Sequence, residues 1–291
     1  MNTVKRHSHG HSNPLRAWAR EVRDLSGLHA DATVHAGMPG ILLSHMLNQL
    51  GRSDILAKPR ADWLFWLQLA SELGRGLFQV AANPRGTTTT IHVLGQDVEV
   101  PSGSGDESTA VSWTDVWGVA RTLRDAKTLE VLHNFDPELL TGVQQSYDLH
   151  HYELVFAFRD TDRWEWDWES SANRAIEHME TRPLMSPKGV PLAKGVAECI
   201  LALGRKDEAA FNEALFEALN GHKAFLGSRN NRIRVKNLFS FELLGLCSVA
   251  HDMGLAISVE SDYIPRWLYT QEPVTDELSA ELLPFLSQES T

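Results

Sequence analysis

The sequence predicts a mainly α-helical protein, either a multi-helix orthogonal bundle or an array of helical hairpins, with one small β-hairpin around residues 87–100. Two observations support this fold class. Apolar residues recur at three- and four-residue steps along most of the chain, which is the spacing of a helix face. Residues 87–100 change to short β-branched runs on either side of a Gly-Gln-Asp turn, which is the pattern of a hairpin.

Capping residues indicate where the N-terminal helices begin and end. Asn13 and Pro14 favour a helix start, because an asparagine side chain caps free N–H groups and proline fits the first turn. A second helix is predicted over residues 38–50, with Gly51 after it. The longest helix is predicted over residues 60–82. Its apolar side chains fall on more than one face, so we expect it to pack on several neighbours.

Residues 238–268 have the clearest pattern in the chain. Residues 238–253 are apolar on almost every side, which is typical of a helix surrounded by other helices. Gly254 follows at the place where a helix usually ends. Residues 255–259 alternate as in a short extended segment, and Pro265 fits the first turn of a closing helix. The prediction is a buried central helix, a sharp stop, an extended return and a last short helix.

A helical hairpin is predicted ahead of that stretch. Residues 192–203 and 207–219 form two helical patterns joined by Gly-Arg-Lys-Asp. Small residues on the first helix oppose bulky residues on the second, which indicates a closely packed antiparallel pair of the tetratricopeptide kind. The sequence contains one such unit, so a repeat array is not predicted. Near the end of the chain, residues 276–283 are predicted to form one small helix.

The expected domain organisation is simple. Residues 1–12 are expected to be a flexible tail, since they are polar and rich in histidine. Residues 13–291 are expected to be a single α-helical domain. This domain is either undivided or made of two packed halves, 13–182 and 192–270, with a break near the proline-rich residues 183–191.

The net charge of −11 is concentrated in one region. Residues 91–180 hold 18 of the 38 acidic side chains and 6 of the 27 basic ones, whereas the rest of the chain is nearly balanced. A region of one sign attracts a basic partner and speeds its association. The same charge argues against direct binding of nucleic acid, whose partners carry basic surfaces. The alternative is that the acidic region only keeps the protein soluble.

Sequence features that report on the cellular compartment favour the cytoplasm. No secretory signal and no apolar run long enough to span a membrane is recognised. The closest run, residues 63–82, is interrupted by charged and amide side chains. Cys199 and Cys247 lie on apolar helical patterns, which predicts buried and reduced thiols. We therefore expect a cytoplasmic protein without membrane attachment.

Histidine and glutamate side chains are the candidates for metal or acid–base chemistry. Glu130 and His133 have the E-x-x-H spacing of di-iron carboxylate bundles, but such sites need a second matching pair, which the sequence lacks. His150 and His151 are adjacent and would point about 100° apart on a helix, so they do not easily serve one metal. His45 lies among apolar neighbours and is expected to be a core histidine. We expect no metal, no cofactor and no catalytic residue.

Three tryptophans alternate with carboxylates in residues 160–169. As a strand, the segment would place the two kinds of side chain on opposite faces, and as a helix it would spread both around the surface. Aromatic area and negative charge together suit the capture of a basic protein. The alternative is that the tryptophans belong to the core and the carboxylates are merely solvated. The candidate partner-binding residues are Asp160, Asp162, Trp164, Glu165, Asp167 and Glu169.

The C-terminal stretch also resembles a known family. Residues 250–254, Ala-His-Asp-Met-Gly, and residues 259–265, Val-Glu-Ser-Asp-Tyr-Ile-Pro, lie between an apolar helix and a short final helix. This arrangement resembles the C-terminal signature of the Immunity protein 49 family, and the helix-GRxD-helix element over residues 192–219 fits the same family. The signature residues, which the resemblance implies to be structural, are Gly254, Glu260, Ser261, Tyr263 and Pro265.

The resemblance implies a bacterial immunity protein that binds a cognate polymorphic toxin in the cytoplasm and blocks it without catalysis. An acidic surface would then occupy the active or substrate-binding face of a basic toxin domain, such as one that acts on nucleic acid. Two alternatives stay open from the residues themselves. One is a helical scaffold or adaptor for another protein. The other is a metal-dependent hydrolase that uses Glu130, His133, His150, His151 or His178.

Overall fold

The structure is a computed structural model that describes residues 2–7, 13–141, 149–161, 164, 167–181, 190–227 and 235–286. Helices dominate the described residues, and strands form only two small pairs there. The predicted fold class, mainly α with one small hairpin around residues 87–100, is therefore confirmed. The predicted break near residues 183–191 lies largely outside the described residues.

The elements follow one another in a simple order along the chain. The α-helices are α1 (Pro14–Asp24), α2 (Leu28–Ala32), α3 (Met38–Ile55), α4 (Arg60–Ala81), α5 (Ala110–Leu123), α6 (Ala126–Asn134), α7 (Leu149–Asp160), α8 (Trp168–Thr181), α9 (Val190–Gly204), α10 (Glu208–Leu226), α11 (Phe241–Asp252), α12 (Arg266–Tyr269) and α13 (Leu283–Leu286). The 3-10 helices are η1 (Leu25–Gly27), η2 (Pro137–Leu139) and η3 (Val235–Leu238). The strands are β1 (Asn2–Val4), β2 (Thr88–Val93), β3 (Gln96–Pro101) and β4 (Val259–Ser261).

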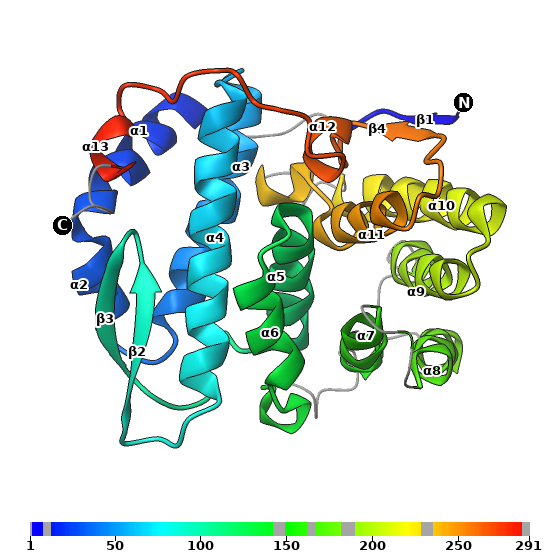
Figure 1. The fold of residues 1–291 in the computed structure, drawn as a ribbon, viewed down its shortest axis with the longest axis horizontal. Coiled ribbons are helices and arrows are strands. Elements are labelled where there is room, and N and C mark those ends of the chain that lie inside the picture. The colour runs from blue at the N-terminus through cyan, green and yellow to red at the C-terminus, as the bar shows by residue number, and fades with distance from the viewer. Residues whose placement is uncertain are drawn as a thin grey trace.

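Figure 1 shows how these elements are arranged. Helices α1 to α4 and the hairpin β2–β3 lie on one side of the molecule, α5 and α6 lie in the middle, and α7 to α10 lie on the other side. Helix α11 packs against both α5 and α9, so it connects the middle of the molecule to the second side. The buried apolar side chains of all three parts form one continuous core.

Capping predicts the start of α1 correctly, whereas the predicted end of α3 is wrong. The side chain of Asn13 accepts a hydrogen bond from the Arg16 N–H at 3.0 Å, and proline occupies the first turn. Helix α3 continues past Gly51 to Ile55. A Cβ atom on Gly51 would lie 2.3 Å from the Val235 carbonyl oxygen. This glycine therefore permits close packing of α3 against η3 and does not end the helix.

The β-hairpin has the predicted place and a different turn. Residues Leu94 and Gly95 form the two-residue turn, and both have positive φ angles, 47° and 73°. Such a turn matches the twist of the two strands, and glycine adopts it without strain. The predicted Gly-Gln-Asp turn is thus shifted toward the N-terminus. Ile91 and Val93 are buried, which fixes the hairpin against α4.

Helices α5 and α11 cross so closely that glycine is required at the contact. A Cβ atom on Gly118 would lie 2.1 Å from the Phe241 carbonyl oxygen, and one on Gly245 would lie 2.8 Å from the Cα of Gly118. Beside this crossing, the buried Trp117 ring lies 4.3 Å from the ring of Phe158 on α7. The prediction that α11 is buried on nearly every side is confirmed, because its apolar residues are almost all inaccessible to solvent.

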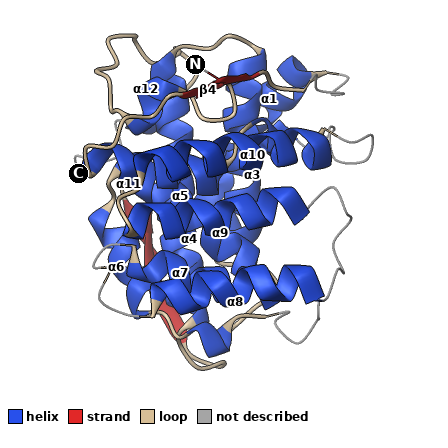
Figure 2. Ribbon diagram, turned by 90° about the vertical axis from the view of Figure 1, so that its right-hand side faces the viewer, coloured by secondary structure: helices blue, strands red, loops and turns tan. Residues whose placement is uncertain are grey.

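Helices α7 to α10 form a stack in which α9 lies between α8 and α10 (Figure 2). The predicted helical hairpin is present as α9 and α10. A Cβ atom on Gly195 would lie 2.6 Å from the Cβ of Ala218. A Cβ atom on Gly221 would lie 2.4 Å from the backbone nitrogen of Leu192. The two helices are therefore in near backbone contact through small residues. Asp207 begins α10, because its side chain accepts the Ala210 N–H at 2.9 Å.

The prediction of a flexible tail is wrong for residues 2–7. Strand β1 pairs in parallel with β4, with Asn2 opposite Val259 and Val4 opposite Ser261. Arg6 then forms an ion pair with Asp54 at 2.8 Å. The pairing joins segments that lie 257 residues apart, and local composition carries no information about such a distant partner. Residues 8–12 lie outside the described residues.

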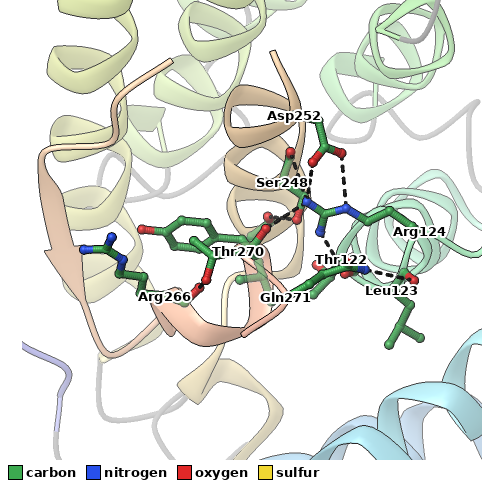
Figure 3. A network of polar contacts seen from close by, with 10 residues as sticks. Thr122, Leu123, Arg124, Ser248, Asp252, Arg266, Thr270 and Gln271 are labelled. Atoms are coloured by element: carbon green, nitrogen blue, oxygen red, sulfur yellow. Dashed lines mark hydrogen bonds and ion pairs between the residues drawn. The ribbon is translucent and has the colours of Figure 1, made fainter. Parts of the chain in front are cut away.

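Arg124 joins the end of α5 to α11 and α12 (Figure 3). Its guanidinium donates two hydrogen bonds to Asp252, at 3.1 and 2.6 Å, and one to the Tyr269 carbonyl oxygen at 2.8 Å. Arg124 ends α5 in the left-handed conformation, with a φ of 55°. A bidentate arginine–carboxylate pair is directional as well as charged, so it sets the orientation of α11 relative to α5.

The C-terminal helix predicted over residues 276–283 is wrong. Asp276 and Ser279 form hydrogen bonds with the start of α4, where the Asp276 side chain accepts the Arg60 N–H at 3.0 Å and Ser279 donates to Asp62. These polar groups therefore form hydrogen bonds with the start of α4 and do not stabilise a helix over residues 276–283. The short helix α13 follows instead. Within the described part of the chain, no helix is both long and apolar enough to cross a membrane.

Candidate partner-binding surface

The tryptophan-rich segment that was predicted to bind a partner lies between α7 and α8. The rings of Trp164 and Trp168 meet edge to face with centroids 5.1 Å apart, and both are partly buried against the core. A Cβ atom on Gly204 would overlap the Trp168 ring, so the end of α9 supports this pair. Asp162 and Glu165 lie outside the described residues. The two described tryptophans therefore serve packing at least in part.

The described carboxylates of this segment differ in their surroundings. Asp160 ends α7 and is half-buried, and burial raises the pKa of its carboxyl above the usual value. Asp167 and Glu169 are exposed at the start of α8. Asp167 lies 3.5 Å from Arg174, and Glu169 pairs with Arg205 on the loop after α9. Part of the negative charge of the segment is thus balanced within the protein.

A larger acidic feature lies next to this segment, between α8, α9 and α10. It is a hollow of about 480 Å³, which we call the α9–α10 groove. Its floor is apolar and its rim carries four carboxylates and one arginine. The lining residues are Ile176, Glu198, Leu201, Ala202, Arg205, Asp207, Ala210, Glu213, Ala214 and Glu217.

The rim of the groove is strongly acidic. Burial raises the pKa of the Glu198 carboxyl above its usual value, Lys194 opposes this shift, and the carboxylates of Glu213, Glu180 and Glu217 add to it. Lys194 is itself bound by Glu180 at 3.0 Å. Crowded carboxylates repel one another. A cation that binds among them reduces this repulsion, so its binding is favourable. The groove is therefore suited to basic side chains.

Arg205 connects the predicted segment with the groove. It lies on the groove rim and pairs with Glu169 at the start of α8. The residue before it, Gly204 at the end of α9, packs against Trp168. The acidic segment and the groove are thus neighbouring parts of one surface around the ends of α8 and α9.

Sequence reasoning missed the groove carboxylates because they lie outside the acidic region at residues 91–180. Glu213 and Glu217 are one helical turn apart, so they share a face of α10, and a sequence signal for them existed. Glu198 lies on a different helix. Its approach to the other two follows from the pairing of α9 with α10, which residue spacing within a helix does not reveal.

A second hollow, of about 270 Å³, lies between α5, α7, α11 and the open end of the α9–α10 hairpin. We call it the Glu242 hollow. Oε1 of Glu242 accepts a hydrogen bond from Thr114 at 2.6 Å and lies 3.9 Å from Nδ1 of His151. Burial, opposed by the bond from Thr114, raises the pKa of Glu242 to about 7. Glu242 lies inside the apolar run 238–253, away from the polar end of that run at His251 and Asp252, and this position is a sequence signal for a buried carboxylate.

The family-signature residues hold the N-terminal strand and the end of α11. Gly254 follows Met253, the C-cap of α11, and has a φ of 79°, a conformation that favours glycine. The Ser261 hydroxyl donates to the Val4 carbonyl oxygen at 2.8 Å. Tyr263 is fully buried, and its hydroxyl accepts the His7 N–H at 2.9 Å.

The other two signature residues lie on either side of Tyr263. Glu260 is exposed in β4, and Pro265 directly precedes α12 in an extended conformation. Pro265 therefore caps the helix instead of occupying its first turn, one position earlier than expected. Of the five signature residues, Ser261 and Tyr263 form side-chain hydrogen bonds with the N-terminal segment.

The candidate metal and acid–base residues are dispersed. Glu130 is exposed on α6. Nε2 of His178 lies 3.8 Å from Oε1 of Glu153. The ring centroids of His150 and His151 lie 4.1 Å apart. Among the described residues, no group of three or more His, Cys, Asp and Glu side chains is placed to hold a metal ion. Cys199 and Cys247 are free and buried, as predicted.

The prediction of a core histidine at position 45 is wrong. The side chain of His45 is 48% exposed, and its Nδ1 lies 3.3 Å from Glu21. Its hydrogen bond with Glu21 raises the pKa of His45. Helix α1 supplies this carboxylate from a distant part of the chain, so the apolar neighbours of His45 in sequence gave a misleading picture of its surroundings.

Comparison with known families assigns the chain to one of them. The chain matches the family model described as Immunity protein 49 over residues 58–268, which is most of its length. The chain belongs to the Immunity protein 49 family. The resemblance noted in residues 250–265 is thereby confirmed, and the match includes the α9–α10 groove, the Glu242 hollow and the signature. Helices α1 to α3 lie outside it. Searches of curated proteins and of solved structures find no match.

Membership of the Immunity protein 49 family supports a role as an immunity protein and implies a toxin as the partner. Immunity proteins of this family are named for a protective role, so a surface that binds another protein is the relevant kind of site. In this member, the α9–α10 groove combines a concave shape, an apolar floor and a net negative charge from four carboxylates and one arginine.

Proposed function

We propose that this Immunity protein 49 member binds its toxin directly in the cytoplasm and blocks it without catalysis, using the α9–α10 groove as its main contact surface. The observation that supports the proposal is the concentration of four carboxylates against one arginine around an apolar floor. Interfaces of stable complexes combine an apolar centre with a polar rim. The groove has this composition, and its charge selects a basic partner.

The acidic segment next to the groove extends the proposed surface. The exposed carboxylates of Asp167 and Glu169 add negative charge at the border, and we propose that Asp160, Asp162, Trp164 and Glu165 belong to the same contact region. A basic toxin face would thus meet a surface that is acidic over three helices.

Inhibition by contact follows from the charge of the proposed surface. A toxin that acts on an anionic substrate, such as nucleic acid, presents basic side chains where that substrate binds. An acidic surface competes for those side chains, so the bound immunity protein would cover the substrate-binding face. This proposal requires no catalytic group and no cofactor in the immunity protein.

Chemical labelling of carboxylates tests where the toxin binds. Carbodiimide coupling with glycine ethyl ester modifies exposed carboxylates, and Glu213, Glu217, Glu99 and Glu277 are all exposed in the free protein. We expect the cognate toxin domain to protect Glu213 and Glu217 from labelling by about tenfold or more, because a tight interface excludes reagent and water from its centre. Glu99 on the hairpin and Glu277 near the C-terminus serve as matched controls.

The pattern of protection decides the outcome. Labelling of Glu99 and Glu277 should be the same with and without toxin. If the toxin protects Glu99 and Glu277 and leaves Glu213 and Glu217 fully labelled, the interface lies away from the groove. The groove proposal would then be wrong. The measurement uses the protein without any substitution, so altered folding does not complicate it.

A further inference from the structure

The Glu242 hollow has the shape and chemistry of a small binding site that the groove does not explain. Its volume is about 270 Å³, and apolar side chains of Leu154, Phe225, Leu226 and Phe239 line much of it. Glu242 lies among these apolar groups with its side chain 16% exposed. The hollow thus offers apolar walls and the carboxyl group of Glu242, next to the ion pair of Asp115 with Lys236.

The charged groups around Glu242 leave its carboxyl without a full compensating charge. Lys236, the cation among the described lining residues, pairs with Asp115 at 3.2 Å. His151 faces Glu242 from α7, and burial lowers its pKa to about 4. His222 faces the hollow from α10, and burial lowers its pKa also to about 4. Both imidazoles are therefore neutral near pH 7 and supply no positive charge.

The hydrogen bonding of Glu242 is also incomplete on one side. Thr114 and His151 both approach Oε1, at 2.6 and 3.9 Å, and neither contact involves Oε2. A buried carboxylate becomes stable when a cation and a hydrogen-bond donor reach it together. A ligand that brings both would convert Glu242 from the neutral to the charged form.

We propose that the Glu242 hollow binds an alkylammonium or alkylguanidinium group, with its aliphatic stem against Leu154, Phe225 and Phe239 and its cationic head on Glu242. Lysine and arginine side chains have this structure, an apolar stem that ends in a charged donor. A free aliphatic amine has it as well. The head donates a hydrogen bond to the carboxylate, and Glu242 loses its proton to solvent as the cation binds.

Binding of n-butylammonium tests this chemistry without the toxin. This ion has the stem and the head of a lysine side chain. We expect it to raise the melting temperature of the wild-type protein at millimolar concentration and to leave that of Glu242→Gln unchanged. Sodium chloride at the same concentration controls for ionic strength, and 1-butanol controls for the stem alone. No shift in the wild type, or the same shift in Glu242→Gln, would overturn the proposal.

The affinity for n-butylammonium should depend on pH in a defined direction. Glu242 is mostly protonated at pH 6 and mostly ionised at pH 8, because its pKa in the free protein is about 7. The cation binds the ionised form, so the affinity should rise about tenfold between these pH values and then level off. His151 and His222 are neutral over this range, so they do not add to the change in affinity with pH. An affinity that is flat or falls with pH would contradict the assignment.

The stability of the free Glu242→Gln variant provides an independent check. The pKa of Glu242 in the folded protein lies above the usual 4.5, so its stabilising contribution is full below that pH and is lost as the pH rises through about 7. At pH 8 the variant should therefore melt at a higher temperature than the wild type. A lower melting temperature would mean that a cation of the same chain already pairs with Glu242, and the proposal would be wrong.

Competition identifies the natural source of the cationic group. If a side chain of the toxin occupies the hollow, addition of the toxin domain should displace n-butylammonium, and one lysine or arginine of the toxin should couple to Glu242 in a double-mutant cycle. If the toxin binds and the amine stays bound, the site belongs to a free aliphatic amine. The amine experiment stands without the toxin, so its result is separate from the fate of the groove proposal.

Discussion

Replacing Gly118 with alanine is expected to lower the free energy of unfolding by about 3 kcal/mol or more. The added Cβ atom would lie 2.1 Å from the Phe241 carbonyl oxygen and 2.4 Å from its carbonyl carbon. These atoms belong to the backbone of the residue that begins α11, so they cannot turn aside as a side chain would. Helix α11 must shift, and its buried contacts with α5 would be lost.

Urea denaturation of the two proteins measures this effect. Gly27→Ala is the matched control, because Gly27 has a negative φ of −96° and its nearest contact to an added Cβ is 3.9 Å. Alanine at this position should change the free energy of unfolding by less than about 1 kcal/mol. Equal effects of the two substitutions would mean that the α5–α11 crossing is wider than described.

Reversing two charges on the groove is expected to slow association with the toxin about 100-fold at low ionic strength. The double variant Glu213→Lys/Glu217→Lys changes the rim of the groove from acidic to basic. Both side chains are exposed and point away from the core, so the free energy of unfolding should change little. A basic toxin face would then be repelled where it was attracted. Stopped-flow measurement of the association rate gives the result directly.

Added salt and a matched variant distinguish two effects on the association rate: attraction by the groove carboxylates and the overall net charge. Glu99→Lys/Glu277→Lys makes the same change in net charge at exposed positions away from the groove. We expect this control to slow association only slightly. Added salt should slow the wild type and speed up the groove variant, because screening removes attraction in one and repulsion in the other. Equal slowing in both variants would leave the groove with no special role in binding.

Most of the fold could be predicted from the sequence because its helices carry local signals. Asn13 and Pro14 mark the start of α1, and the all-apolar run before Gly254 marks a buried helix. The small residues at the interface of α9 and α10 also showed that these helices pack as a hairpin. In each case the deciding interaction lies within one or two helical turns or between adjacent helices.

The features that could not be predicted depend on distant contacts. Strand β1 is held by β4 at the other end of the chain. Gly51 follows a helical pattern and so predicts a helix end, whereas its real role is set by Val235, which is distant in sequence. Composition alone predicts the candidate surface at residues 160–169. Two of its exposed carboxylates are paired with arginines, and the larger acidic groove arises only when α9 and α10 come together.

Titration of the toxin's activity with purified immunity protein tests the central claim most directly. The claim is that the protein neutralises its toxin by stoichiometric contact, and the cognate toxin domain is the partner to use. We expect activity to fall in proportion to the protein added and to reach zero at one equivalent, with no chemical change in the toxin. A toxin that remains active in excess immunity protein, or one that is inactivated by far less than one equivalent, would contradict this account.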